Sequence, residues 1–116
     1  MKRDMELIRL LLLVVENDEP VPEVEKYSEE QQTYHLALCI EAGLIDGAVV
    51  KDMNGYPAAA SAIRLTWAGH ELLDAARNNT IWNKALAHLK KAGVQVTLPL
   101  LEELLKKTAK EVLGLP

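Results

Sequence analysis

The chain has no phenylalanine, and only 4% of its 116 residues are aromatic. Its core must therefore be built from leucine, isoleucine, valine and alanine, which favours packed helices over a β-sandwich. A single cysteine, Cys39, excludes an internal disulfide and favours a reducing, cytoplasmic compartment. Hydrophobic residues make up 49% and charged residues 26% of the chain. This balance indicates a folded domain with a modest core rather than a disordered chain.

Long hydrophobic runs are also missing. The apolar run 10–15 follows Lys2 and Arg3, which is the order found in a secretory signal peptide. However, charged residues interrupt the stretch, and acidic residues follow it where a small-residue cleavage site would stand. The run is far shorter than the roughly 20 residues that a membrane-spanning helix needs. We therefore expect a buried helix and no contact with a membrane.

The net charge of −4 is unevenly distributed. Residues 1–76 carry 6 basic and 14 acidic side chains, a balance of −8, whereas residues 77–116 carry 7 basic and 3 acidic, a balance of +4. The opposite charges can hold the C-terminal part on the rest of the chain, or they can draw two chains together. An acidic total argues against nucleic acid as the partner, because a basic surface is expected for that role.

Helical periodicity predicts a first helix over residues 3–16 that is apolar on two sides. Its two faces consist of Ile8, Leu11, Leu12 and Val15, and of Leu7, Leu10 and Val14. A helix that is apolar on both sides is usually buried on both sides. We expect one face to pack on the core and the other on the C-terminal helices or on a partner chain.

A second helix follows an acidic connector. Residues 17–27 contain two prolines, which predicts a connector with room for one short extended piece. Ser28 and Gln31 then have the spacing of a capping box, in which each side chain binds the backbone of the other residue. This pattern predicts a helix that runs to about Ala42. Gly43 supplies the left-handed residue that ends it.

The next elements are predicted to be a β-hairpin and a third helix. Strands are expected over 44–50 and 62–65, joined by a loose loop that contains the turn signal Asn54-Gly55. Thr66 then caps a helix over 67–77.

Two more helices complete the chain. The first covers 81–92, with Asn79 or Thr80 as its cap and Gly93 at its end, and the second begins at Thr97. One apolar stripe on the last helix contains Leu101, Leu104, Leu105, Ala109 and Val112. Its opposite face carries Lys106, Lys107 and Lys110.

This order of elements predicts an α+β fold that is mostly α. A helix followed by a hairpin and another helix is typical of a winged helix-turn-helix-like domain, here over residues 1–78. Residues 79–116 form a C-terminal two-helix extension on the same core. Two local patterns support this interpretation. Residues 41–45 turn a helix into a strand through a glycine, and residues 64–73 place Gly69 where close helix packing would need it.

Three segments also resemble a known family, the domain of unknown function 2513. They are residues 1–9, residues 34–45 and, most specifically, residues 65–84. The resemblance covers nearly the whole chain. It implies a helix-turn-helix superfamily fold and a prophage or mobile-element context, and it implies no catalytic residues. One departure from ordinary winged helices is that the segment before Ser28 is too short and proline-rich for a full middle helix.

Few residues suggest chemistry. His35 and Cys39 lie four apart on one helix, a spacing that can hold a metal, but two ligands do not make a site. We expect both to be at least partly exposed, with His70 in a packing or capping role and His88 on a solvated face. No glycine-rich phosphate loop is present, and no nucleophile has a neighbouring base. We therefore expect no enzyme, no cofactor and no metal.

Two functional hypotheses remain, with an enzyme that uses His35 or His70 as a distant third. A prophage-type regulator would contact DNA through Gln31, Gln32, His35, Lys51 and Arg64, since glutamine can read adenine. The predicted recognition helix, however, contains no lysine or arginine for phosphate. The alternative is a homodimeric or adaptor module that does not bind DNA. Its expected interface consists of Leu7, Leu10, Val14, Leu101 and Leu105.

Overall fold

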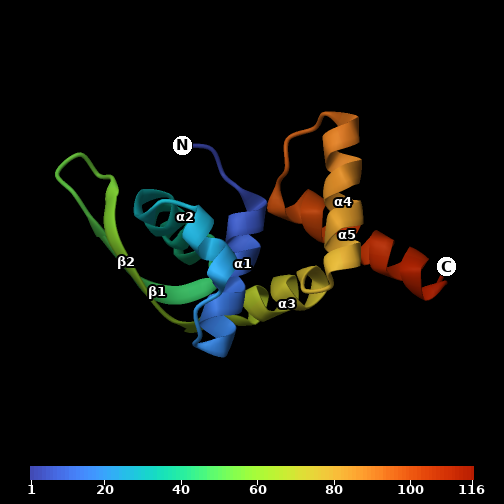
Figure 1. Ribbon diagram of the computed structural model, residues 1–116, viewed down its shortest axis with the longest axis horizontal. Coiled ribbons are helices and arrows are strands. Elements are labelled where there is room, and N and C mark those ends of the chain that lie inside the picture. Colours follow the sequence, from blue (N-terminus) through green and yellow to red (C-terminus); the bar gives the residue numbers. More distant parts are fainter. The chain divides into compact units, whose positions relative to one another are not determined.

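The computed structural model describes residues 1–116 and contains five α-helices, one 3₁₀-helix and one two-stranded antiparallel sheet (Figure 1). The prediction of a mostly helical α+β fold is therefore confirmed. The chain forms two compact units, Met1–His70 and Glu71–Pro116. The predicted boundary, between 78 and 79, lies just beyond the third helix. The structure contains no helix with the length and hydropathy of a membrane span.

Helix α1, Met5–Asn17, begins at Asp4, whose Oδ1 accepts a hydrogen bond of 3.2 Å from the Leu7 N–H. It ends at Asp18, which is left-handed with φ 52°. The connector that follows contains a 3₁₀-helix, η1 (Pro22–Lys26), rather than the expected extended piece. Proline at the first helical position suits this turn, because its missing N–H would have no partner there anyway.

The second apolar face of α1 is covered by neighbouring segments of the same unit. Leu7, Leu10 and Leu11 form a buried cluster with Val24 of η1. Packed against this cluster are the partly buried Leu13, Val14, Val21, Tyr27 and Leu36. The expectation that this face needs the C-terminal helices or a partner chain is therefore wrong. The 3₁₀-helix that begins at Pro22 covers it instead.

Helix α2, Glu29–Glu41, and the hairpin formed by β1 (Ile45–Lys51) and β2 (Pro57–Leu65) follow. Figure 1 shows α2 beside the hairpin, and the Tyr34 and Tyr56 rings meet there with centroids 5.9 Å apart. Strand β2 starts at Pro57, so the predicted start at residue 62 and the loose loop are wrong. The loop is short because Asp52 Oδ1 accepts hydrogen bonds of 2.9 Å from the N–H groups of Asn54 and Tyr56.

The hairpin contains a β-bulge near its base. Asp46 pairs with Arg64 and Gly47 pairs with Ala62, so Ile63 has no partner on β1. A bulge bends the strand and redirects the extra side chain. Ile63 accordingly lies in solvent, with 78% of its surface exposed. A period-2 pattern cannot show such a residue, which is why the sequence did not predict it.

The junction between α2, the hairpin and α3 (Trp67–Ala76) depends on two residues. Thr66 Oγ1 accepts a hydrogen bond of 3.0 Å from the Gly69 N–H and donates one of 2.5 Å to the Gly43 carbonyl. A Cβ atom on Gly69 would collide with the Leu44 carbonyl oxygen. The sequence predicts close helix packing at Gly69. The structure shows a close approach there, but of the Leu44 backbone just after α2 and not of another helix.

The second unit contains α4 (Asn79–Ala92) and α5 (Leu98–Leu113), which pack against each other. Asn78 caps α4, since its Oδ1 accepts a 3.0 Å hydrogen bond from the Ile81 N–H, so neither Asn79 nor Thr80 is the cap. Thr97 caps α5 as predicted. The buried stripe of α5 differs from the expected one at its end, because Thr108 is buried and Val112 is exposed.

We predict that Gly69→Ala lowers the free energy of unfolding by about 1–3 kcal/mol, the usual range for overpacking. Alanine is the better helix former by up to about 1 kcal/mol, so this loss would come from the contact with Leu44 and not from helix propensity. Chemical denaturation monitored by circular dichroism measures the change. Glu71→Ala, at an exposed position of the same helix, should stay within about 0.5 kcal/mol. Equal stability of the Gly69→Ala variant and the original chain would contradict the prediction.

Candidate functional site

Gln31 and Gln32, the predicted adenine readers, both use their side chains within the chain. Gln31 Oε1 accepts a 2.9 Å hydrogen bond from the Ser28 N–H, and the Gln31 N–H donates to Ser28 Oγ at 3.0 Å, which confirms the capping box. Gln32 Nε2 donates to the carbonyl oxygens of Val24 and Tyr27 at 3.1 and 2.9 Å. Reading adenine requires the amide oxygen and nitrogen together. In each glutamine, one of these two groups is already hydrogen-bonded to a backbone group of another residue in the chain.

His35 is buried, with 1% of its surface exposed, so the prediction that it faces outward is wrong. The Asp4 N–H donates to its Nε2 at 2.9 Å, which assigns the ring proton to Nδ1. Nδ1 in turn lies 2.8 Å from the Gln31 carbonyl oxygen, to which it donates. Asp4 also affects Tyr27. Burial raises the pKa of Tyr27, and the negative charge of Asp4 and its hydrogen bond raise it further. His35 therefore connects the start of α1 to α2, and both of its ring nitrogens are hydrogen-bonded to backbone groups.

Cys39 is equally buried, and the expectation of partial exposure is wrong for it as well. Burial raises the pKa of its thiol to about 12. The structure places no group of three or more His, Cys, Asp or Glu side chains around a common point suited to a metal ion. His70 is exposed rather than packed, and its Nδ1 lies 3.7 Å from Glu16 Oε2.

The two cationic residues of the predicted DNA surface have different environments. Arg64 Nη2 lies 2.6 Å from Asp46 Oδ2 across the hairpin, and its Nη1 donates to the Leu65 carbonyl at 3.1 Å. Lys51 is exposed at the end of β1. The structure thus brings the predicted residues to one region, the helix and hairpin of the first unit, but it leaves mainly Lys51 available to a phosphate.

The predicted interface residues lie inside the single chain. Leu7 and Leu10 belong to the buried cluster around Val24, and Val14 packs against it while staying partly exposed. Leu101 and Leu105 are buried on α5. Dimerisation through the four buried leucines would require the chain to open. Periodicity identified them correctly as buried, but it cannot distinguish burial by the same chain from burial by another.

A family model described as "Hypothetical protein (DUF2513)" matches residues 2–95. The chain belongs to the family of domain of unknown function 2513. It is also similar to an uncharacterized protein of Haemophilus influenzae, with 31% identity over 120 residues, 98% of this chain and 100% of that protein. No solved structure matches the chain. The resemblance seen in the sequence is therefore confirmed at the level of this family.

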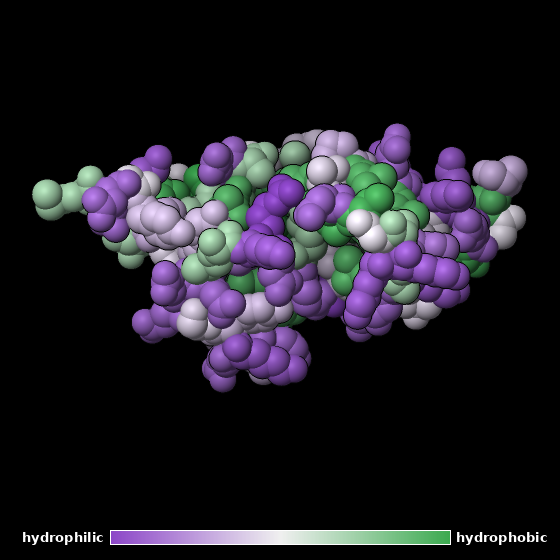
Figure 2. Space-filling view, turned by 90° about the horizontal axis from the view of Figure 1, so that it is seen from above, coloured by the Kyte–Doolittle hydropathy of each residue, from purple (hydrophilic) through white to green (hydrophobic).

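Sequence reasoning missed four strongly exposed apolar residues in and directly after the hairpin of this family member. We call them the hairpin surface: Val50, Met53, Ile63 and Trp67, which are 62%, 104%, 78% and 80% exposed. The hairpin projects at the left of Figure 1 and again at the left of Figure 2, where green marks hydrophobic atoms at its extremity. One signal was available. Trp67 directly follows the capping Thr66 and is therefore the first residue of its helix, a position that often faces solvent.

We predict that the Cys39 thiol reacts with a disulfide reagent at pH 8 far more slowly in the folded protein than in denaturant. The pKa of about 12 leaves almost no thiolate, and burial blocks access to it. The unfolded thiol ionises more easily, so the free energy of unfolding should also fall as the pH rises from 9.0 towards about 12. The matched control combines Cys39→Ala with Ser61→Cys, an exposed position that should react at once. Equal labelling rates at the two positions would show that Cys39 is accessible.

Proposed function

We propose that this protein is a winged-helix-type interaction module that binds a protein partner through its hairpin surface and does not read DNA sequence. The order α1, η1, α2 and hairpin supports the winged-helix assignment, with η1 in the place of a full middle helix. One observation carries the functional part. Gln31, Gln32 and His35 on α2 bind backbone groups of the chain itself. Val50, Met53 and Ile63 of the hairpin, in contrast, lie in solvent.

The electrostatics of α2 argue against DNA. A winged helix of the usual kind lays this helix in the major groove, close to phosphates. Here its first turn carries Glu29 and Glu30, and the helix contains no lysine or arginine. Affinity for DNA depends largely on phosphates neutralised by basic side chains. An acidic helix end would instead repel them.

The hairpin surface has the composition of a protein-binding site. Tryptophan is enriched among residues that dominate binding energy, and exposed apolar side chains next to polar ones are typical of such contacts. Trp67 and Ile63 supply exposed apolar area, and Arg64, which follows Ile63 in the chain, forms an ion pair with Asp46. The bulge that exposes Ile63 is a feature that sheets often use near functional sites.

A mobile-element regulator that touches DNA through its wing is the second candidate. Exposed Lys51, at the tip end of β1, is the observation that favours it. The two candidates differ in their response to salt, because phosphate contacts weaken steeply as salt rises.

We predict that random duplex DNA does not bind at low salt, at about 50 mM, where phosphate contacts are strongest. Fluorescence anisotropy of labelled DNA measures this, with a lysine-rich DNA-binding protein as the positive control. Binding that disappears as salt is raised and that drops in a Lys51→Glu variant would favour the regulator over our proposal.

We also predict that a photo-crosslinking amino acid at position 63 forms an adduct with one protein in the native host. The same group at exposed Ala87 of α4 is the matched control and should give no such adduct. Trp67→Ser should reduce the adduct while changing the free energy of unfolding by no more than about 0.5 kcal/mol, since Trp67 is mostly in solvent. An adduct that forms equally at 63 and 87, or that is unaffected by Trp67→Ser, would count against a specific hairpin surface.

A further inference from the structure

The first unit contains a groove that combines apolar and acidic side chains. It has a volume of about 460 Å³ and lies where the end of α1 meets η1. Its apolar lining includes Val14, Val21 and Val24, and its charged lining consists of Asp18, Glu19 and Glu25. All three carboxylate residues are exposed, and no basic residue lines the groove. We call this feature the valine groove.

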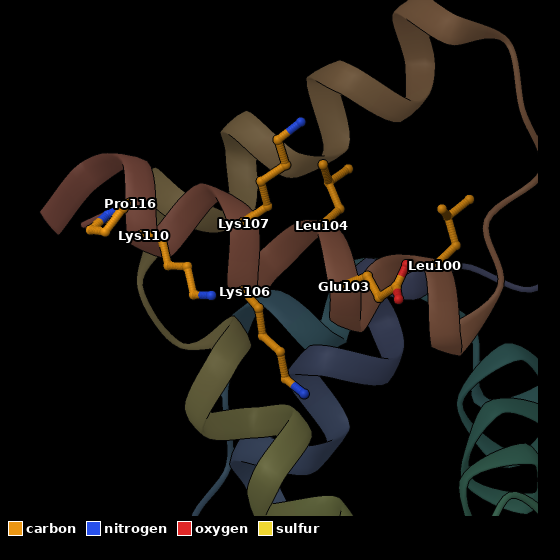
Figure 3. Close-up of a pocket in the computed structure, with 7 residues that line it drawn as sticks. All are labelled: Leu100, Glu103, Leu104, Lys106, Lys107, Lys110 and Pro116. Atoms are coloured by element: carbon orange, nitrogen blue, oxygen red, sulfur yellow. The ribbon is translucent and has the colours of Figure 1, made fainter. Parts of the chain in front are cut away.

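The second unit has a surface of the opposite charge on α5. A shallow depression of about 590 Å³ is lined by Leu100, Leu104 and Pro116, by Lys106, Lys107 and Lys110, and by a single acid, Glu103. Figure 3 shows Leu104 and Lys107 extending side by side from the helix. Further along, Val112, Leu113 and Leu115 are 46%, 70% and 56% exposed. We call this combination of lysines and exposed apolar residues the α5 surface.

We propose that the α5 surface of one copy of the chain docks in the valine groove of a second copy. The two surfaces match in both properties that determine protein contacts. Each offers aliphatic side chains whose burial favours association, and lysines line one surface whereas carboxylates line the other. Every copy carries one groove and one α5 surface, so two copies can satisfy each other reciprocally. This contact is separate from the hairpin surface and does not depend on it.

An anionic membrane is the other partner that lysines and leucines on one helix can suggest. Helix α5 also contains Glu102, Glu103 and Glu111, so its lysines and glutamates balance to zero. The presence of a complementary groove in the same chain therefore favours the second copy.

Charge reversal on each surface tests the proposal. Sedimentation velocity of the full chain should show a mass that rises with protein concentration and falls at high salt. Glu19→Lys with Glu25→Lys should weaken self-association roughly tenfold, and so should Lys107→Glu with Lys110→Glu. An equimolar mixture of the two variants should regain association, because the reversed groove of one accepts the reversed helix of the other. The matched control, Lys84→Glu with Lys90→Glu on exposed positions of α4, should leave self-association unchanged.

Three results would overturn the proposal. A protein that stays monomeric at every concentration and salt would exclude docking between copies. The same result is expected if the α5 surface docks within its own chain. Association that persists in both reversed variants, or that the mixture does not regain, would place the interface elsewhere. If the protein is monomeric and binds anionic lipid vesicles, and if Lys107→Glu with Lys110→Glu abolishes this binding, the α5 surface would be assigned to membranes. All substituted residues are exposed, so each variant is expected to fold, which thermal melting would check.

Discussion

The contact between Gly69 and the backbone of Leu44 fixes the arrangement of the first unit. Helix α3 can begin directly beneath the end of α2 only because no side chain separates them. Thr66 secures this approach from both sides, since one hydroxyl caps α3 and also binds the Gly43 carbonyl. The direction in which the hairpin leaves and re-enters the core follows from this junction.

Local signals in the sequence predicted the helices and the junction well. The capping box at Ser28, the end of α2 at Gly43 and the cap at Thr66 are short-range patterns, because the atoms that bind are only a few residues apart. The cap of α4 was misplaced by one residue or more because three adjacent polar residues, 78–80, are all suitable caps and only geometry selects Asn78.

Long-range contacts account for what could not be predicted. A helical wheel places His35 away from the apolar side of α2, but the chain before α1 covers it and binds its Nε2 through Asp4, 31 residues away. The length of β2 was underestimated because 58–62 is a run of alanines and one serine with weak strand propensity, and pairing with β1 overrides that preference. The candidate DNA residues were chosen by chemical type. Whether such a residue can contact DNA depends on its hydrogen-bond partners in the folded chain, and the order of residue types in the sequence does not show these partners.

The bulge at Ile63 also has an evolutionary consequence. Side chains alternate strictly along a strand, so one inserted or lost residue exchanges inward and outward positions beyond that point. Here the extra residue, Ile63, lies between the base of the hairpin, where Leu65 is buried, and the solvent-exposed arm, which is the rest of the hairpin up to its tip. A single codon gained or lost at this place would present a different set of side chains on the arm while the base stayed intact. Relatives could thus change what they recognise through length variation alone, without any substitution in the interior.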